Sequence, residues 1–247
     1  MLVSIITPCF NPNLELLETI ESVQNQTYSN YEHIIIDDCS LSIMPDELSR
    51  IIEADPKIKF VQRSWNAGPA VTRNRGIAEA QGNFIAFLDA DDVWHASKLE
   101  KQLQFMLEND VSLSYTSYEV FDTKGKVIGL RTPPLSLNYS DILKSNQLGC
   151  LTAMYSVDAL GKVYMPNISK RQDMGLWLKI LKMGVIAKRC DNKPLARYRV
   201  GSQSVSSNKL SVLKYQWRIY REVERLSLRS SIKYFGHYAF KGMTRKV

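Results

Sequence analysis

The sequence predicts an α/β fold in which a central, mostly parallel sheet is covered by helices on both faces and followed by C-terminal amphipathic helices. The first observation behind this prediction is that strand-like and helix-periodic segments alternate four times within the first hundred residues. The second is that residues 84–88 are apolar throughout and rich in Phe and Ile, as in a strand buried on both faces. The 247 residues suffice for one such domain with a small addition.

The first half of the chain has the clearest pattern. Its strands are expected at residues 2–7, 31–36, 58–61 and 84–88. Its helices are expected at residues 13–26, 46–54, 69–80 and 97–108, where apolar residues recur at helical spacing. Asn13 is a typical cap for the first of these helices, and Pro69 suits the first position of the third.

The second half is less regular. Strands are expected at residues 111–116, 148–155, 185–188 and 195–200, and a hairpin over 118–128 is expected to turn at 122–125. Helices are expected at 173–183 and from 208 to about 228, with a polar loop at 201–207 between them. We therefore expect one domain over residues 1–205, with halves 1–110 and 111–205, and a basic helical segment over 206–247.

The positive charge of the chain is concentrated near its C-terminal end. From residue 208 onward, ten Lys or Arg stand against two Glu, which gives this segment a net charge of +8. The rest of the chain carries −1, for a total of +7. This distribution indicates a local partner surface, not a generally basic protein. Four scattered cysteines without a CxxC pair favour reduced thiols, and no run approaches the ~18 apolar residues of a membrane span. Since the chain also begins without the basic segment of a signal peptide, we expect it in the cytoplasm.

Three carboxylates follow the buried strand at residues 84–88. Asp89, Asp91 and Asp92 stand at its carboxyl end, where open α/β sheets bind their ligands. Three carboxylates so near to one another repel each other. A hard cation such as Mg²⁺ or Mn²⁺ that also carries a phosphate would relieve the repulsion. The alternative is that Asp91 and Asp92 cap the next helix.

Further polar and aromatic residues follow the other predicted strands. Phe10 suits stacking on a nucleobase with Thr7 beside it, although Phe10 would equally suit the core. Asp38, with Asp37 before it, suits a ribose hydroxyl or a base N–H, and the alternative is a turn aspartate. Arg73 suits phosphates and carboxylates. Because these strand ends meet at one edge of a parallel sheet, we expect one shared crevice.

The motifs at these positions resemble those of glycosyltransferase family 2, the inverting GT-A enzymes that use nucleotide-sugar donors. In the order of the family, the matching segments are Ile5-Ile6-Thr7-Pro8-Cys9-Phe10-Asn11, Ile35-Ile36-Asp37-Asp38-Cys39-Ser40, Asn66-Ala67-Gly68 with Arg73-Asn74-Arg75-Gly76-Ile77, Phe87-Leu88-Asp89-Ala90-Asp91-Asp92 and Arg171-Gln172-Asp173-Met174-Gly175-Leu176-Trp177-Leu178. A single DxD is a weak signal, but five motifs in register are specific. The resemblance implies a Rossmann-like nucleotide-sugar-binding half over 1–110 and an acceptor-binding half over 111–205.

The resemblance also implies roles for individual residues. Asp91 and Asp89 would form the DxD and hold Mn²⁺ or Mg²⁺, with Asp89 nearer the ribose and donor sugar. Asp173 would be the general base that deprotonates the acceptor hydroxyl, and its alternative is the N-cap of its helix. Nucleotide-binding roles fall to Thr7, Phe10, Asp38, Arg73 and Asp89, and Gln172 and Trp177 would lie near the sugars.

Some positions depart from the family pattern. Cys39 replaces the usual Gly, Gln172 replaces a frequent Glu, and Phe10 replaces a frequent Tyr. Gly201 stands where many members carry a His, so a third protein metal ligand from that loop is not expected. We interpret His33 and His95 as structural.

The C-terminal segment carries a basic stripe at helical spacing, formed by Lys214, Arg218, Arg221, Arg225 and Arg229. A neighbouring apolar stripe consists of Val212, Tyr215, Ile219, Val223 and Leu226. A basic amphipathic helix favours peripheral binding to the inner face of the bacterial cytoplasmic membrane. The alternative is that the apolar stripe docks on the main domain or on a second subunit, as in a homodimer.

The sequence thus predicts a metal-dependent inverting glycosyltransferase. The resemblance implies a UDP-sugar donor carrying a hexose such as Glc or Gal, or an N-acetylhexosamine, and a lipid-diphosphate-linked O-antigen or capsule intermediate as acceptor. One alternative is a haloacid-dehalogenase-like phosphatase that uses Asp89 and Asp91. Another is an inactive glycan- or lipid-binding module. No motif indicates nucleic-acid binding.

Overall fold

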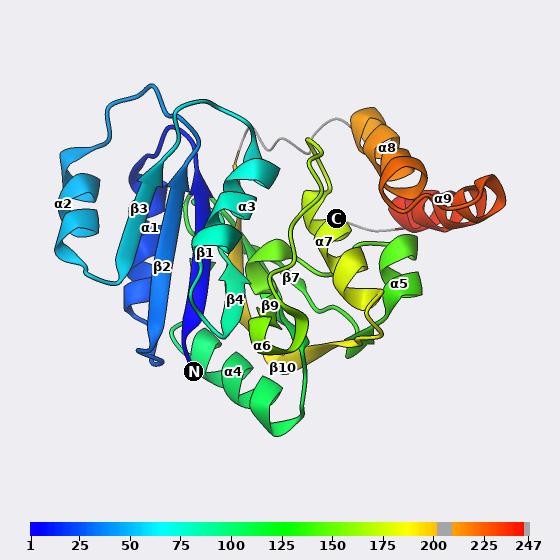
Figure 1. Ribbon diagram of the computed structural model, residues 1–247, viewed down its shortest axis with the longest axis horizontal. Coiled ribbons are helices and arrows are strands. Elements are labelled where there is room, and N and C mark those ends of the chain that lie inside the picture. Colours follow the sequence, from blue (N-terminus) through cyan, green and yellow to red (C-terminus); the bar gives the residue numbers. More distant parts are fainter. Residues whose placement is uncertain (202–208, 245–247) are drawn as a thin grey trace.

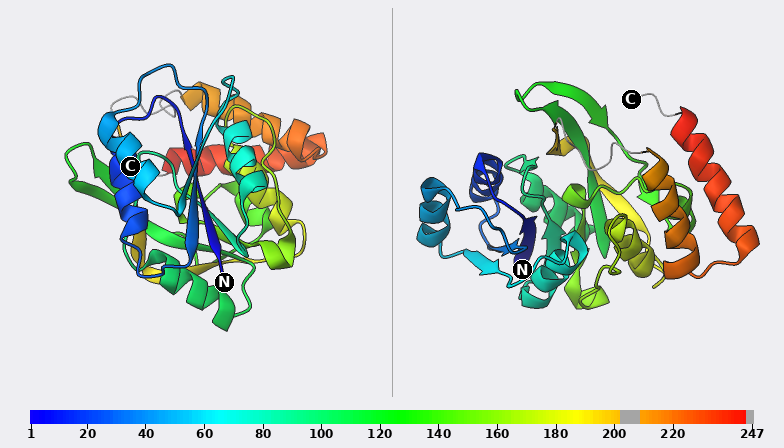
Figure 2. Two further views of the ribbon diagram at one scale, coloured as in Figure 1. Left: turned by 60° about the vertical axis from the view of Figure 1, so that its left-hand side comes forward. Right: turned by 90° about the horizontal axis from the view of Figure 1, so that it is seen from above.

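A single mixed sheet runs through the computed structural model, which describes residues 1–201 and 209–244 (Figure 1). Within these residues the sheet has ten strands in the order β3-β2-β1-β4-β9-β6-β10-β5, with β7 paired to β6 and β8 to β10. Helices cover both faces, and α8 and α9 lie at the opposite end of the sheet from α2 and β3 (Figures 1 and 2). The α/β expectation is confirmed.

The first half follows the predicted order of strands and helices. Its elements are β1 (Val3–Cys9), α1 (Leu14–Gln24), β2 (Tyr31–Asp37), α2 (Asp46–Ala54), β3 (Ile58–Gln62), α3 (Pro69–Glu79), β4 (Phe84–Phe87) and α4 (Lys98–Glu108). β3, β2, β1 and β4 pair in parallel. Asn13 caps α1 by accepting a 3.0 Å hydrogen bond from the Glu15 N–H, and Pro69 opens α3, as predicted.

The second half contains more irregular elements. They are β5 (Val93–Trp94), β6 (Leu113–Asp122), β7 (Val127–Arg131), β8 (Ser136–Leu137), α5 (Tyr139–Lys144), a 3₁₀ turn (Cys150–Thr152), β9 (Met154–Ser156), α6 (Val157–Leu160), α7 (Gln172–Leu181), β10 (Ala187–Val200), α8 (Lys209–Arg218), a π-helical turn (Ile219–Val223) and α9 (Leu228–Thr244).

Three predictions in this half are corrected. The two strands expected at 185–188 and 195–200 are one strand, β10, whose register against β6 shifts on both sides of Pro194 because proline cannot donate to the ladder. The strand expected at 148–155 begins as a 3₁₀ turn, and only its end pairs with the sheet. The hairpin turns at 122–125 as expected, but its first strand, β6, already begins at Leu113.

The central strand β4 is buried on both faces, as its sequence predicts. Ile85 and Phe87 belong to an apolar cluster with residues of α3 and α7, whereas Phe84 and Ala86 belong to a second cluster with residues of α1 and α4. These two clusters fix the end of β4, which carries the aspartates. The position of the candidate site is therefore set by core packing.

The C-terminal segment is not one continuous helix. The helical path from α8 ends at Val223, Arg225 adopts φ 51°, and α9 begins at Leu228. The predicted stripe from Lys214 to Arg229 is therefore divided between two helices. Three expected features lie outside the described part of the chain. They are the boundary between residues 205 and 206, most of the loop at 201–207, and the side chain of Val212.

The apolar side of this segment packs on the main domain. Ile219 and Tyr220 are fully buried in the cluster that contains α5 and α7, and the Tyr220 hydroxyl donates to the Leu143 carbonyl at 2.5 Å. Val223 and Leu226 pack against the same cluster. Three residues of the predicted apolar stripe, Ile219, Val223 and Leu226, therefore dock on the main domain, as the alternative interpretation expected.

The described residues contain no helix that is both long and apolar enough to cross a membrane. The four cysteines are all free.

We predict that Gly76→Ala destabilises the fold. A Cβ at Gly76 would lie 2.4 Å from Ile6 Cγ2, so α3 would have to move away from β1. Overpacking of this kind costs about 1–3 kcal/mol of unfolding free energy. Urea denaturation measures the effect.

Gly236→Ala is the matched control, since it makes the same change in a helix interior with open space around the new methyl group. It should be neutral or stabilise by up to about 1 kcal/mol. Equal effects of the two variants would contradict the packing argument.

Candidate active site

Three carboxylates lie at the carboxyl end of β4, in the loop that leads to β5. Asp89 is partly exposed, Asp91 is exposed, and Asp92 is 1% exposed. The next helix, α4, begins only at Lys98, after β5. The alternative that Asp91 and Asp92 cap a helix is therefore wrong.

Negative charge is concentrated in this loop. Although the Asp91 side chain is accessible to solvent, the protein atoms around its carboxylate partly desolvate it, and together with the charge of Asp89 this raises the pKa of Asp91 to about 6. Burial, with Asp89 and Asp91 nearby, raises the pKa of Asp92 well above its ordinary value, and Asp92 Oδ2 is buried without a hydrogen-bond partner among the described residues. Carboxylate oxygens with uncompensated charge suit Mg²⁺ or Mn²⁺. Within residues 1–201 and 209–244, no three His, Cys, Asp or Glu side chains form a metal site by themselves.

Arg199 of β10 supports the acidic loop, a role that the sequence did not reveal. Its backbone N–H donates to Asp92 Oδ1 at 2.9 Å, and its Nε donates to the Asp91 carbonyl at 2.8 Å. Its Nη2 donates to Glu18 of α1 at 2.5 Å. Arg199 thus ties the loop to two other elements. In the sequence, Arg199 stands only as one residue of the strand expected at 195–200, and nothing in that pattern indicates a contact with the distant acidic loop.

Arg73 of α3 is buried and forms an ion pair with Asp89. Burial opposes its charge, but Asp89, Cys150 and Asp173 outweigh this effect and raise the pKa of Arg73. Asp173, 84 residues beyond Asp89, is therefore close enough for its charge to act on the same guanidinium. By contrast, Arg75 pairs with Glu79 on the exposed face of α3.

The paired aspartates after β2 have different surroundings. Asp38 is buried and accepts hydrogen bonds from Arg63 Nη1 at 2.6 Å and from the Ala67 and Gly68 N–H groups at 3.1 and 2.7 Å. It therefore holds the turn that starts α3, and its binding to base or ribose stays a prediction. Asp37 accepts from the Ser40 N–H at 3.1 Å, which matches the turn alternative.

Phe10 and Thr7 differ strongly in exposure. Phe10 is 52% exposed at the end of β1, so its ring is accessible to a ligand. Thr7 is fully buried, and its hydroxyl shares a 2.8 Å hydrogen bond with His33 Nε2. Burial lowers the pKa of His33 to about 3, so His33 is neutral and structural, as predicted. A contact between Thr7 and a nucleotide stays a prediction.

Asp173 lies at the N-terminal end of α7 but does not cap it. The cap residue is Arg171 and the helix begins at Gln172, so the capping alternative for Asp173 is wrong. Asp173 Oδ2 accepts a 3.0 Å hydrogen bond from Asn146 Nδ2, and the carboxylate lines a cavity of about 160 Å³. Asn146 is a second residue that the sequence analysis missed.

The two other residues predicted near the sugars are less accessible. Gln172 is half-buried, with no hydrogen-bond partner for its Oε1 among the described residues. Trp177 is 0% exposed and packs edge-on against Phe87 of the core, so it lies beneath the site. The arrangement brings together an acidic loop, two arginines and a separate carboxylate beside a cavity. That combination suits binding of a charged ligand next to a group that accepts a proton.

Comparison with known proteins agrees with the resemblance. The family model described as Glycosyl transferase family 2 matches residues 4–160. The chain is 40% identical over 247 residues to the putative teichuronic acid biosynthesis glycosyltransferase TuaG of Bacillus subtilis, covering 100% of this chain and 98% of TuaG. It is 36% identical to WfgD of Escherichia coli, a UDP-Glc:alpha-D-GlcNAc-diphosphoundecaprenol beta-1,3-glucosyltransferase, covering 88% and 85% of the two chains.

Two solved structures show the same fold. Residues 1–349 of S. aureus TarS in complex with UDP-GlcNAc superpose with a TM-score of 0.71 and 18% identity, covering 97% of this chain and 72% of that TarS fragment. The mannosyltransferase PcManGT from Pyrobaculum calidifontis, in complex with GDP-Man and Mn²⁺, superposes with a TM-score of 0.69 and 14% identity, covering 99% and 76%.

We predict that Cys39→Gly stabilises the protein. Cys39 adopts φ 64° in the loop after β2, a left-handed conformation that costs a non-glycine residue roughly 1–2 kcal/mol. Glycine removes this strain but loses more entropy on folding. We expect a net gain of about 1 kcal/mol in the free energy of unfolding, measured by urea denaturation.

Cys39→Ala serves as the control for loss of the thiol, because alanine keeps the strained backbone. It should give no gain in stability. If Cys39→Ala stabilised the protein as much as Cys39→Gly, backbone strain would not be the cause.

Proposed function

Because the chain belongs to glycosyltransferase family 2 and is a glycosyltransferase of the GT-A fold, we propose that it transfers a sugar from a UDP-sugar to a lipid-diphosphate-linked glycan with inversion. The observation that carries this proposal is the acidic loop after β4, where the exposed Asp91 and the partly exposed Asp89 lie beside the buried Arg73. The family assignment favours this function over the phosphatase and the inactive module.

The donor would lie along the carboxyl ends of β1, β2 and β4. We assign the exposed ring of Phe10 to stacking on the base, with Thr7 and Asp38 supporting that end of the site. Arg73 offers a buried cation to the nucleotide, and Asp89 orients it through their ion pair. This half, residues 1–110, would be the nucleotide-sugar-binding half, and residues 111–205 would hold the acceptor.

A divalent ion, Mn²⁺ or Mg²⁺, fits the acidic loop. Asp91 and Asp89 would hold it, because their oxygens are accessible and their mutual repulsion is unfavourable without a cation. When bound, the ion would offset the charge that develops on the leaving diphosphate. Arg199 keeps the loop in place from behind.

Asp173 would act as the general base. Its carboxylate faces a cavity that an acceptor hydroxyl can enter, and it accepts one hydrogen bond, from Asn146, among the described residues. The carboxylate would take the hydroxyl proton as the oxygen attacks the anomeric carbon from the face opposite the diphosphate. Attack from that face inverts the anomeric centre.

The nature of the substrates rests on the relatives. The printed activity of WfgD favours a UDP-bound hexose, with an N-acetylhexosamine as the second choice, and a sugar-diphosphate lipid as acceptor. That of TuaG favours a role in a bacterial surface polysaccharide, such as an O-antigen or a capsule.

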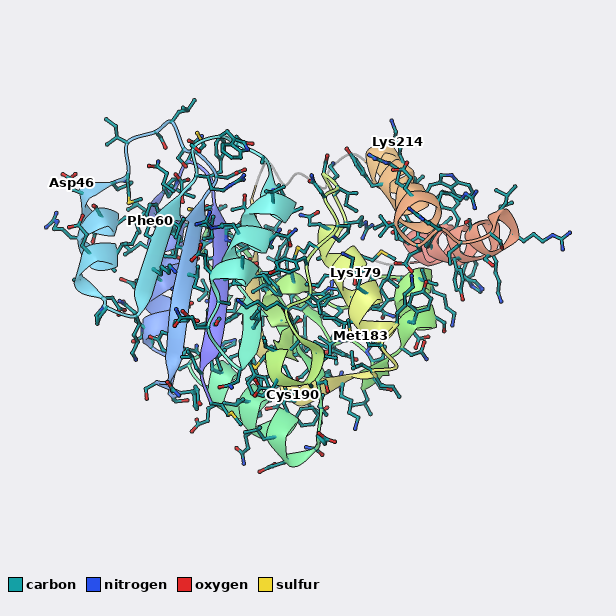
Figure 3. The ribbon with its side chains drawn as sticks, in the orientation of Figure 1. Asp46, Phe60, Lys179, Met183, Cys190 and Lys214 are labelled. Atoms are coloured by element: carbon teal, nitrogen blue, oxygen red, sulfur yellow. The ribbon has the colours of Figure 1, made fainter. Side chains whose placement is uncertain are left out.

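The C-terminal helices would bind the inner face of the cytoplasmic membrane. Leu228, Ile232 and Phe240 are 57%, 58% and 63% exposed on the outer face of α9, with Arg229 and Lys233 exposed beside them. Lys214 of α8 and Arg221 of the π-helical turn are exposed, Arg218 pairs with Glu222, and the Lys214 side chain lies at the outer edge of the molecule (Figure 3). An exposed apolar face bordered by cations suits anionic lipids.

Release of nucleoside diphosphate from a panel of nucleotide sugars tests the reaction. We expect release from one UDP-sugar, dependent on Mn²⁺ or Mg²⁺ and on a sugar-diphosphate-lipid acceptor, and lost with chelator. Phosphate release from simple phosphomonoesters, without any sugar transfer, would overturn the proposal.

Two variants separate the roles of the carboxylates. Asp173→Asn should reduce transfer by at least about 100-fold and leave UDP binding intact, because it removes only the proton acceptor. Asp91→Ala should weaken metal-dependent UDP binding, measured by calorimetry. Asp46→Asn is the control, because Asp46 is an exposed residue of α2 far from the site (Figure 3). It should change neither the transfer rate nor UDP binding. Transfer by Asp173→Asn at the wild-type rate would refute the base assignment.

Membrane binding has its own test in vesicle co-sedimentation. The protein should bind vesicles containing phosphatidylglycerol more than neutral phosphatidylcholine vesicles, and salt should weaken the binding. Ile232→Glu should reduce it severalfold, since it places a charge on the apolar face of α9.

Ile43→Glu is the matched control, because Ile43 is 93% exposed in the loop before α2, at the other end of the molecule. Equal loss in both variants would contradict the assignment of α9. A dimer in solution that Ile232→Glu dissociates, without vesicle binding, would show that the face meets a second subunit.

A further inference from the structure

The cavity beside Asp173 has a polar lining. It encloses about 160 Å³ between the β6–β7 hairpin and residues 146–149, and its polar side chains come from Tyr118, Arg131, Asn146, Gln147 and Asp173. At roughly 30 Å³ per water molecule, it has room for about five waters. A volume of this size accommodates a single sugar ring.

The outer wall of this cavity is held in place by hydrogen bonds. Tyr115 donates its hydroxyl to the Pro134 carbonyl at 2.7 Å, and Arg189 Nη1 donates to the Pro133 carbonyl at 2.5 Å. The Arg189 N–H also donates to the Leu135 carbonyl at 2.9 Å. The segment that follows β7 is thus anchored to β6 and β10, which fixes this wall of the cavity.

Asn146 fixes the orientation of the Asp173 carboxylate. Its Nδ2 donates to Asp173 Oδ2 at 3.0 Å, while its Oδ1 accepts from the Leu148 N–H at 3.3 Å. The second bond determines which end of the amide faces the carboxylate. Oδ1 of Asp173 accepts no hydrogen bond from the described side chains, so it is the oxygen left for a ligand in the cavity.

Arg131 places a guanidinium without an ion-pair partner among the described residues in the lining of the cavity. It is the last residue of β7, and it is exposed. Two arginines of β10, on the far side of β6, are engaged, since Arg197 lies 3.3 Å from Glu119 and Arg189 donates to the Pro133 carbonyl. A free guanidinium that lines a cavity suits a phosphate, which it can bind through two N–H groups.

We propose that this cavity holds the terminal sugar of the acceptor, that Asn146 is a positioning residue for Asp173, and that Arg131 binds the phosphate next to that sugar. The inference rests on the proposed function and adds the residues that select the acceptor. The acceptor hydroxyl lies against Asp173 Oδ1 and gives its proton to that oxygen, while Asn146 keeps the carboxylate from rotating away.

The role of Asn146 is tested by steady-state kinetics with the UDP-sugar that supports wild-type transfer. Asn146→Ala should lower kcat by roughly 10- to 100-fold and leave the KM for the donor within about twofold, because it disturbs only the orientation of the base. Asn146→Asp is a second, isosteric variant that retains the packing and should also lower kcat, since it places a like charge beside Asp173. Wild-type kcat in both folded variants would overturn the positioning role.

The role of Arg131 is tested with two synthetic acceptors that share one sugar, a sugar-diphosphate-alkyl compound and the neutral alkyl glycoside. Arg131→Gln should raise the KM for the diphosphate acceptor by about tenfold or more and change that for the glycoside by less than about twofold. Lys126→Gln is the matched control, since it removes an exposed cation from the same hairpin outside the cavity. Equal effects on both acceptors, or none, would overturn the phosphate contact.

These results also separate the inference from the proposed function. If the wild-type chain transfers sugar and the Asn146 and Arg131 variants have the kcat and KM of the wild type, the inference alone is overturned. Absence of transfer to any acceptor by the wild-type chain would overturn the proposed function and the inference with it.

Discussion

The burial of negative charge at the end of β4 is the constraint on which the rest of the structure depends. Asp92 is almost fully buried beside Asp89 and Asp91, so the loop needs positive charge from elsewhere in the chain. Arg73 supplies it from α3, and Arg199 supplies it from β10, 107 residues beyond Asp92 in sequence. The acidic loop therefore connects the parallel half of the sheet to the last strand of the other half. Arg199 also donates to Glu18 of α1, so this one residue of β10 joins the last strand both to the acidic loop and to a helix of the first half.

The first half of the fold was predictable because its signals are local. Each strand is a short apolar run, each helix has apolar residues at helical spacing, and Asn13 and Pro69 mark helix starts. The second half was less predictable because its elements depend on distant partners. β5 has two residues and exists only through pairing with β10, and β10 continues through Pro194 because its bulged register keeps pairing with β6. The break after Val223 has no Gly or Pro at the turn, and a continuous periodicity concealed it.

The candidate site shows the same division. The motif residues Asp89, Asp91 and Asp173 could be identified from sequence, because carboxylates at strand ends or in a family motif are visible there. Their supporting residues could not, since Arg199 and Asn146 gain their roles only when distant segments meet. For Thr7 and Trp177, the sequence identified positions of interest but not their surroundings, as both are fully buried. A residue can thus be placed in a motif by sequence, whereas its exposure depends on the packing of the whole domain.

The C-terminal helices pack against the part of the chain that carries Asp173 and are not a separate attachment. Gln216 of α8 lies 3.5 Å from the sulfur of Met174, the residue after Asp173, and Arg171 donates to the Tyr238 hydroxyl of α9 at 2.5 Å. Arg171 is also the cap position of α7, where φ is 66° and no side-chain cap bond is present. The start of the helix that carries Asp173 is therefore stabilised by contacts with α8 and α9 in place of a local cap. Because the outer face of α9 is the surface proposed to meet the membrane, the helix that carries the proposed base would rest on the elements nearest to that membrane.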